Sequence, residues 1–295
     1  MSWRIVSVSK RSYLSLSNNN LKIKQGEEEY TVPLEDIGTL LIEDQSVTMS
    51  AALLDACIKH KIAAFICDEK HIPSGILLGY QQHSRQSKVL FDQVSWTEPF
   101  KKRSWQNVIK QKITNQKSVL EKIKGNGYPS LESYIQSVKS GDPLNREATA
   151  ARLYFSELFP VDCTRGSEHI LNSALNYGYA ILRGAIARSL VSYGFLSSLG
   201  IQHRNELNNF ALADDFIEPY RPCVDYFVFT QIPKEEFFLT KEMRNNLVSI
   251  LTHHVQLDGK RQNIMRAMEV TAQSLTTATN AKDPNLLLLP ELLYE

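Results

Sequence analysis

The period of the hydrophobic pattern changes near residue 84, and this change constrains the fold more than any other feature of the chain. Before it, apolar residues form short runs that alternate with polar residues or are bounded by turns, which is typical of strands. After it, apolar residues recur at helical spacing over long segments. We therefore predict an α+β fold, with a small β-rich domain at 1–83, a linker at 84–100 and a larger all-α domain at 101–295.

The N-terminal runs predict a mostly β domain with a short helix. Asn18-Asn19-Asn20 is a turn signal between two apolar runs, and Ser50 is a suitable N-cap for a helix over 50–60. The strands that we expect span 4–8, 13–16, 21–24, 30–32, 40–42, 63–67 and 75–78.

The rest of the chain predicts a helical domain. The Gly-Asn-Gly-Tyr-Pro sequence at 125–129 ends the first long helix, and Asp142-Pro143 is a start signal for the next. A loop is expected at 194–209, and the apolar tail at 286–295 is expected to pack on this domain or on a partner. The helices that we expect span 101–124, 145–158, 168–193, 241–257 and 261–275.

Composition excludes several classes of protein. The 295 residues carry 33 Lys and Arg against 32 Asp and Glu, a net charge of +1, which argues against a uniformly basic chain that coats nucleic acid. With 43% hydrophobic residues, the chain is typical of a globular protein rather than a disordered one. The sequence has no run of about 18 uninterrupted apolar residues, and charges interrupt its N-terminus. We therefore expect a cytoplasmic protein without a membrane span or a signal peptide.

The four cysteines form no Cys-x-x-Cys pair, which argues against a zinc ribbon or a thioredoxin-like centre. Scattered free thiols fit a reducing cytosol. We interpret Cys57, Cys67, Cys163 and Cys223 as small buried apolar residues.

A strongly basic segment follows the predicted linker. Residues 101–124 hold eight Lys or Arg and one Glu, a local charge of +7. One interpretation is a solvated helix face. The other is a surface that contacts phosphates, because clustered positive charge releases counterions from nucleic acid and makes affinity sensitive to salt. Trp105 within the segment is expected in the core rather than in a stacking role.

Acidic residues in a protein that binds phosphate require a reason, and a divalent metal ion supplies one. Candidate ligands are Glu147, His203 and the acidic group of Asp214, Asp215 and Glu218. Mg²⁺ and Mn²⁺ prefer carboxylate oxygens, and an imidazole favours Mn²⁺. On a helix, Asp215 and Glu218 are three residues apart and share one face. By spacing alone, each candidate is also compatible with a solvated, structural or helix-capping role.

Several motifs occur in an order that is specific in combination. VPLEDIGTLLIEDQSVTMSAALL and FICDEKHIPSGILL lie in the N-terminal domain, and EATAARLYF, LNYGYAILRGAIARSLVSYGF, LGIQH and LADDFIEPYRPCVD follow in the C-terminal domain. In this order and spacing, the chain resembles the universal CRISPR adaptation integrase, the "number one" CRISPR-associated (Cas) protein, and in particular its type II branch. The resemblance covers nearly the whole chain. It implies an N-terminal domain that forms a dimer and a C-terminal catalytic domain.

By motif, the resemblance assigns Glu147, His203 and Glu218 as catalytic residues and as ligands of Mg²⁺ or Mn²⁺. Many members of the family have Asp at the third position, and Glu there resembles the type II branch. Asp215 matches a second acidic position near the metal, so either Asp215 or Glu218 is the direct third ligand. The candidate DNA contacts are Lys101, Lys102, Arg103, Lys110, Arg146, Arg204 and Arg221. For Arg146, Arg204 and Arg221, which adjoin these motifs, the alternative is a salt bridge within the protein.

The resemblance implies a metal-dependent DNA integrase and endonuclease. Such an enzyme joins the 3′-hydroxyl ends of a short DNA fragment to the leader end of a CRISPR array by transesterification. The implied partners are double-stranded DNA, a second copy of the chain, and the small ferredoxin-like "number two" Cas protein in a heterohexamer. The type II effector nuclease and an accessory ring protein are implied to help select fragments. The alternatives are a non-catalytic DNA-binding scaffold of the adaptation complex and a metal-dependent hydrolase of a small substrate, which does not explain the basic segment.

Overall fold

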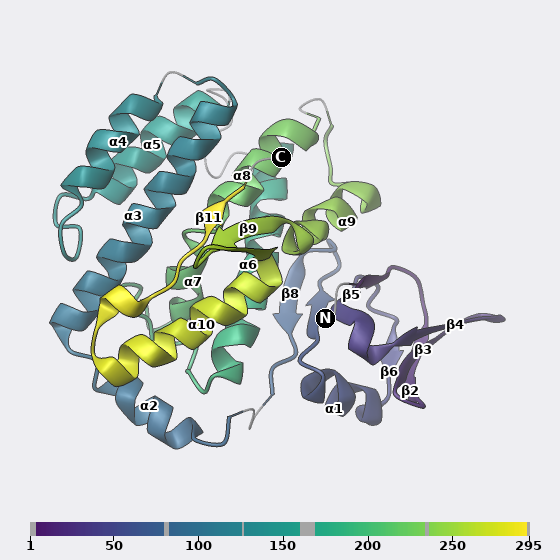
Figure 1. Cartoon of the computed structure of the whole chain (residues 1–295). Helices are drawn as coiled ribbons and strands as arrows, with labels where there is room; N and C mark the ends of the chain where they lie inside the picture. The colour runs from purple at the N-terminus through teal and green to yellow at the C-terminus, as the bar shows by residue number, and fades with distance from the viewer. Residues whose placement is uncertain (1–3, 80–82, 126, 160–168, 234–235, 294–295) are drawn as a thin grey trace. The chain divides into compact units, whose positions relative to one another are not determined.

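The computed structural model describes the chain except for residues 1–3, 80–82, 126, 160–168, 234–235 and 294–295 (Figure 1). The chain separates into two units, residues 1–82 and residues 83–295. The first is mostly β and the second mostly helical, which confirms the predicted α+β class. Cys163 and the predicted start of a helix at 168 lie outside the described residues.

Two four-stranded sheets and one helix build the N-terminal unit. Its elements are β1 (Arg4–Val8), β2 (Tyr13–Ser17), β3 (Asn20–Gln25), β4 (Glu28–Pro33), β5 (Ile37–Ile42), β6 (Thr48–Met49), α1 (Ala51–Lys59), β7 (Ala63–Cys67) and β8 (Pro73–Ile76). One sheet has the order β1-β5-β7-β8, with β1, β5 and β7 parallel, and the other has the order β4-β3-β2-β6. Leu14, Leu40 and Leu53 are fully buried, so both sheets and α1 share one core.

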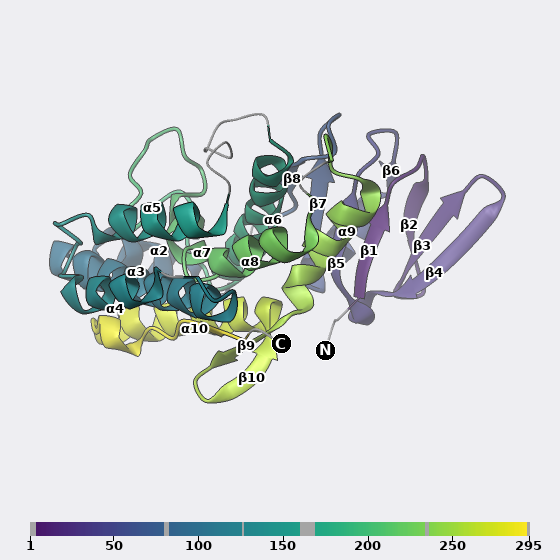
Figure 2. The same cartoon turned by 90° about the horizontal axis from the view of Figure 1, so that it is seen from above.

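The C-terminal unit is built around one long helix. Its elements are α2 (Gln86–Val94), α3 (Glu98–Lys122), α4 (Tyr128–Ser137), α5 (Arg146–Leu158), α6 (Ile170–Ser192), α7 (Ala211–Ile217), α8 (Arg221–Gln231), α9 (Lys241–Ser249), β9 (His254–Leu257), β10 (Lys260–Asn263), α10 (Ile264–Ala281) and β11 (Glu291–Leu292). α6 is buried along most of its length, because α7, α8, α9 and α10 all pack against it. α3, α4 and α5 lie side by side (Figures 1 and 2).

Among the described residues, four α-helices occur where our sequence analysis placed none, namely α2, α4, α7 and α8. The segment 84–100, predicted as a linker, contains α2 and the first turn of α3, which Thr97 caps by accepting a hydrogen bond from the Phe100 N–H. α4 begins at the Tyr-Pro pair that we interpreted only as the end of α3. Proline in the first turn is a start signal for a helix as well as a stop signal for the preceding one.

A β-hairpin replaces parts of the two helices predicted at 241–257 and 261–275, and that prediction is wrong there. α9 ends at Ser249 and continues as a short 3-10 helix over Ile250–Thr252, α10 spans Ile264–Ala281, and β9 and β10 lie between the two helical segments. Asp258 and Gly259 join the strands with φ of 52° and 69°. An Asp-Gly pair with both φ positive is a typical two-residue hairpin turn. The C-terminal unit therefore combines its helices with a three-stranded sheet of the order β10-β9-β11.

The apolar tail packs on the C-terminal unit, one of the two locations that we predicted. Leu287 and Leu292 are buried, and β11 pairs with β9. The side-chain amide of Asn115 on α3 donates hydrogen bonds to the carbonyl oxygens of Pro219 and Pro290. Because Pro290 belongs to the tail, this hydrogen bond attaches the tail to α3. Among the cysteines, Cys57 and Cys67 are buried as predicted, whereas Cys223 is partly exposed.

Candidate metal centre

Glu147 is held at the N-terminus of α5 by a cap from outside the helix. The Asp142 carboxylate accepts hydrogen bonds from the backbone N–H groups of Arg146 and Glu147, both at 2.9 Å. Asp142 and Asn145 both have positive φ, a conformation that Asn and Asp adopt more readily than other residues with a side chain. The cap satisfies two N–H groups that the first turn leaves unpaired. The Glu147 carboxylate thereby projects from a fixed first turn, with its side chain 30% exposed.

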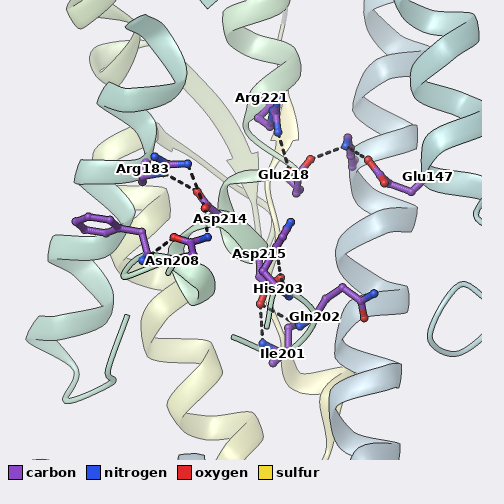
Figure 3. Close-up of polar contacts among 12 residues, drawn as sticks. Glu147, Arg183, Ile201, Gln202, His203, Asn208, Asp214, Asp215, Glu218 and Arg221 are labelled. Carbon is purple, nitrogen blue, oxygen red and sulfur yellow. Dashed lines mark hydrogen bonds and ion pairs between the residues drawn. The ribbon is translucent and has the colours of Figure 1, made fainter. Parts of the chain in front are cut away.

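Glu147, in the first turn of α5, and Glu218, in the turn that follows α7, converge on one point (Figure 3). At that point lies the ammonium of Lys112 on α3, whose Nζ is 2.5 Å from Glu147 Oε1 and 2.5 Å from Glu218 Oε2. The side chains of Lys112 and Glu218 are each only 7% exposed. Two carboxylates this close together repel each other unless a cation lies between them. The protein therefore contains a built cation position between Glu147 and Glu218.

Arg221 supplies a second positive charge to Glu218. Its guanidinium lies 2.8 Å from Glu218 Oε1 and over the ring of Tyr179, 4.1 Å from the ring centroid. The Tyr179 hydroxyl in turn donates to Asp225. Burial by itself raises the pKa of Glu218, but the charges and hydrogen bonds of Arg221 and Lys112 outweigh burial and lower that pKa to about 2. Glu218 is therefore an ionised carboxylate in a buried position.

Asp215 holds His203 in place. The Asp215 carboxylate is fully buried, and it accepts hydrogen bonds from His203 Nδ1 at 2.7 Å and from the backbone N–H groups of Ile201, Gln202 and His203 (Figure 3). The hydrogen bond that His203 donates to Asp215 raises the pKa of His203. The charges of Asp215, Glu218 and Asp214 raise it further, and burial opposes them. Both oxygens of Asp215 are thus already in use.

A glutamine and a glycine stabilise the loop that carries His203. The Gln93 side chain on α2 donates to the carbonyl oxygens of Leu196 and Leu199 and accepts from the Leu196 N–H. At Gly200, a Cβ atom would lie 2.5 Å from the His203 carbonyl oxygen and 2.7 Å from Asp215 Oδ2, so a side chain there would displace the loop. Residues 194–209 form the loop that we predicted.

The third acidic residue of this group, Asp214, has a different partner. Its carboxylate pairs with Arg183 Nε at 2.6 Å and accepts a hydrogen bond from Asn208. These contacts connect α6, the His203 loop and α7. Asp214 therefore supports the fold beside the site, in line with the structural alternative that the sequence left open.

Two hollows flank the site. One, of about 370 Å³, is lined by residues that include Lys112, Glu147, Arg152, Tyr179 and Arg221. The other, of about 460 Å³, is lined by residues that include Trp96, Gly200, His203 and Arg204. Trp105 is buried, as predicted, and its ring meets the His203 imidazole edge-on at 5.9 Å between centroids. Glu147 and the His203 imidazole therefore each border a hollow, whereas Glu218 is buried.

The donor set fits a divalent cation in its chemistry. Two carboxylates already share one cation, and Lys112 occupies that position. Hydrogen bonding through Nδ1 leaves the Nε2 atom of His203 as the second nitrogen that can serve as a ligand. In the part of the chain that the structure describes, no three His, Cys, Asp or Glu side chains are already grouped as a metal site. Metal ligation by Glu147, His203 and Glu218 stays a prediction.

Three of the seven predicted DNA contacts form ion pairs with carboxylates of the protein. Arg204 is bound by both oxygens of Glu98, at 3.0 and 2.9 Å, Lys101 lies 3.7 Å from the same residue, and Arg221 is paired with Glu218. Arg146 lies over the Tyr134 ring, 5.7 Å from its centroid. Lys102 and Arg103 are exposed, and Lys110 is half-buried. DNA binding by these residues stays a prediction.

Our sequence analysis missed Lys112, which it counted only as one charge of the basic segment. The signal was present, because Lys112 falls on the buried stripe of α3 together with Trp105, Val108 and Val119. A lysine on the apolar face of a helix requires a buried anionic partner. Helical spacing did not reveal that Glu147 and Glu218 are those partners. Tyr179 and Asp225, the further partners of Arg221, carried no such signal.

Comparison with known proteins shows the family. The family model of the CRISPR associated protein Cas1 matches residues 5–248. The "CRISPR-associated endonuclease Cas1" of Neisseria meningitidis serogroup C (strain 8013) is 39% identical over 297 residues, which cover 99% of this chain and 97% of that protein. This chain belongs to the Cas1 family, so the family that our sequence analysis predicted is confirmed. The predicted class of enzyme is confirmed at the level of the family, whereas the type II branch stays a prediction.

Solved structures share the fold. A "Casposase bound to integration product" is similar with a TM-score of 0.75 and 22% identity, over 96% of this chain and 92% of that chain. A chain of a "Cas6-RT-Cas1--Cas2 complex" is similar with a TM-score of 0.73 and 21% identity, over 99% of this chain. The match spans 36% of that longer chain. Among the described residues of this chain, no helix is both long and apolar enough to cross a membrane.

Proposed function

We propose that this chain is a metal-dependent DNA integrase and endonuclease of CRISPR adaptation, which inserts short DNA fragments as new spacers at the leader end of a CRISPR array. The observation that carries the proposal is the convergence of Glu147 and Glu218 on one cation position, in a chain of the Cas1 family. The likeness to a casposase supports integration, because that structure is described as bound to an integration product.

The proposed reaction is a transesterification. A 3′-hydroxyl of the fragment attacks a phosphodiester of the array, a new P–O bond forms, and the bond to another 3′-oxygen breaks. The proton that the attacking hydroxyl loses balances the proton that the leaving oxygen gains. Glu147, His203 and Glu218 would hold Mg²⁺ or Mn²⁺, which when bound supplies positive charge to the phosphoryl oxygens.

Each side chain has a separate task in this proposal. Glu147 and Glu218 bind as carboxylates, and Arg221 keeps Glu218 ionised. Asp215 accepts a hydrogen bond from Nδ1 of His203 and so presents Nε2 as a ligand or as a proton acceptor. We assign Glu218 rather than Asp215 as the direct third ligand, because both Asp215 oxygens already accept hydrogen bonds.

We further propose that the chain acts with DNA and with a Cas2 protein, as the name of the similar complex indicates for that assembly. A dimer through the N-terminal unit, and help from a type II effector nuclease and an accessory ring protein, follow from the resemblance described above. These partnerships would place two copies of the site at the two ends of one DNA fragment.

A strand-joining assay with and without a Cas2 partner tests the proposed function. We expect Glu147→Ala and His203→Ala to abolish joining in Mg²⁺ or Mn²⁺ while DNA binding, measured by gel shift, largely survives. Glu132→Gln is a matched control, because Glu132 pairs with Lys117 on the outside of the protein. Chelator should abolish joining by the wild type. Joining that persists in either site variant, or in chelator, would contradict the proposal.

The alternative is a scaffold that binds DNA without chemistry. It predicts that the wild type binds DNA and forms no joined product in any metal, with or without the partner. The exposed residues Lys102 and Arg103 are compatible with either function, so DNA binding alone does not distinguish an integrase from a scaffold. The presence or absence of a joined product does.

A further inference from the structure

Lys112 lies where a metal cation would bind. Its Nζ is 2.5 Å from Glu147 Oε1 and 2.5 Å from Glu218 Oε2, and its side chain is 7% exposed. These are the two carboxylates that the proposed function assigns to the divalent ion. A lysine elsewhere on α3, such as Lys117, pairs with carboxylates at the surface instead.

An ammonium between two carboxylates has two physical effects. It neutralises the repulsion between Glu147 and Glu218, so it holds both side chains in a converging arrangement without a metal. It also opposes a divalent ion, because two cations repel each other strongly when they share the same oxygen ligands in a poorly solvated place. The first effect arranges the ligands, and the second weakens the affinity of the site for metal.

We propose that Lys112 is an internal competitor of the divalent ion, which keeps Glu147 and Glu218 in place and must leave their oxygens when the ion binds. This inference rests on the proposed function, because it assumes that these carboxylates are metal ligands. It adds a positioning residue to the site and makes metal binding an exchange of one cation for another.

The structure provides room for the ammonium to withdraw. Lys112 borders the hollow of about 370 Å³ that also includes Gln116, Glu147 and Arg152. Its four-carbon stem has several rotatable bonds, so the ammonium can turn into this space while the backbone of α3 stays in place. Met has a similar length and no charge, which makes Lys112→Met a suitable probe of the charge itself.

The test measures Mn²⁺ binding to the full chain by isothermal titration calorimetry, without DNA. We expect Lys112→Met to bind Mn²⁺ at least about tenfold more tightly than the wild type, because the ion no longer displaces an ammonium. Lys112→Arg keeps the charge and should bind Mn²⁺ no more tightly than the wild type. Lys117→Met is the matched control on the same helix, and its Mn²⁺ affinity should stay within about twofold of the wild type.

Thermal melting provides the second readout. In chelator, Lys112→Met should melt at a lower temperature than the wild type, because Glu147 and Glu218 then repel each other. Addition of Mn²⁺ should raise its melting temperature by more than it raises that of the wild type. Lys112→Gln replaces Lys112→Met in both measurements should the Met variant fail to fold.

The outcomes separate the two ideas. Mn²⁺ binding that is lost in Glu147→Gln but is unchanged or weaker in Lys112→Met overturns the role of Lys112 and leaves the metal site intact. Mn²⁺ binding that is unaffected by Glu147→Gln overturns the metal site and the competition together. A purely structural Lys112 predicts a lower melting temperature in chelator without tighter Mn²⁺ binding.

Discussion

Asp215 holds His203 at two points, since it accepts one hydrogen bond from the imidazole Nδ1 at 2.7 Å and another from the His203 backbone N–H at 3.1 Å. Two further backbone N–H groups, from Ile201 and Gln202, donate to the same carboxylate. One buried side chain therefore determines both the path of the loop and the orientation of the ring. This arrangement separates the residue that positions the imidazole from the residues that would bind metal.

The first prediction concerns Asp215→Asn. The amide keeps the shape of the side chain but loses the charge that orients the imidazole, so we expect strand joining and Mn²⁺ affinity to fall by about 10- to 100-fold. Asp214→Asn is the matched control, because Asp214 pairs with Arg183. It should lower thermal stability with a change in Mn²⁺ affinity of less than about threefold. Equal losses of Mn²⁺ affinity in both variants would contradict the assignment.

The second prediction concerns the cap on α5. Asp142→Ala leaves the N–H groups of Arg146 and Glu147 without their acceptor, so we expect a loss of about 1 kcal/mol in the free energy of unfolding. Glu147 is then less well positioned, and Mn²⁺ affinity should also fall. Asp142→Asn retains one acceptor oxygen and should lie between Asp142→Ala and the wild type. Urea unfolding and calorimetry measure the two effects, and an unchanged unfolding midpoint for Asp142→Ala would exclude the cap.

The third prediction concerns stability in acid without metal. The charges around Glu218 lower its pKa from 4.5 to about 2 against the effect of burial, so the unfolded chain binds this proton more readily than the folded chain. The resulting stability is present above pH 4.5 and is lost as the pH falls toward 2, and it is about 3 kcal/mol in full. Glu218→Gln removes this titration, so its free energy of unfolding should fall less steeply between pH 5 and 3 than that of the wild type. Equal slopes in urea titrations would contradict the ionised, buried state of Glu218.

The fourth prediction concerns the basic segment. Arg103 is exposed and Lys110 is half-buried, and both lie on α3. If this face contacts DNA phosphates, Arg103→Gln with Lys110→Gln should weaken DNA binding and reduce the slope of log affinity against log salt by up to about 2. Lys59→Gln with Lys88→Gln removes the same charge from α1 and α2 as a control. A slope that does not differ from that of the wild type would favour a solvated face.

The two-part organisation of the fold could be predicted from local pattern. Every residue of β5 is buried, and the strand ends in the apolar run 40–42. The apolar residues of α6 recur at helical spacing, so the local sequence and the final structure agree in both elements. The hairpin at 254–263 was missed because it contains few apolar residues, so its strands have a weak pattern. The Asp-Gly pair at Asp258 and Gly259 was the signal that could have revealed it. Motif order placed Glu147, His203 and Glu218, and the structure brings Glu147 and Glu218 to one cation.

The sequence by itself determined the division into a β-rich and a helical part, the family, and the residues from which a metal site can be built. Only the tertiary structure decided which partner each charge has: Lys112 lies between Glu147 and Glu218, Arg204 lies against Glu98, and Asp215 lies under His203. The physical reason is that spacing along a helix determines only which side chains share one face of that helix. The charge that a side chain meets comes from another helix or loop, far away in the chain, and depends on how those elements pack.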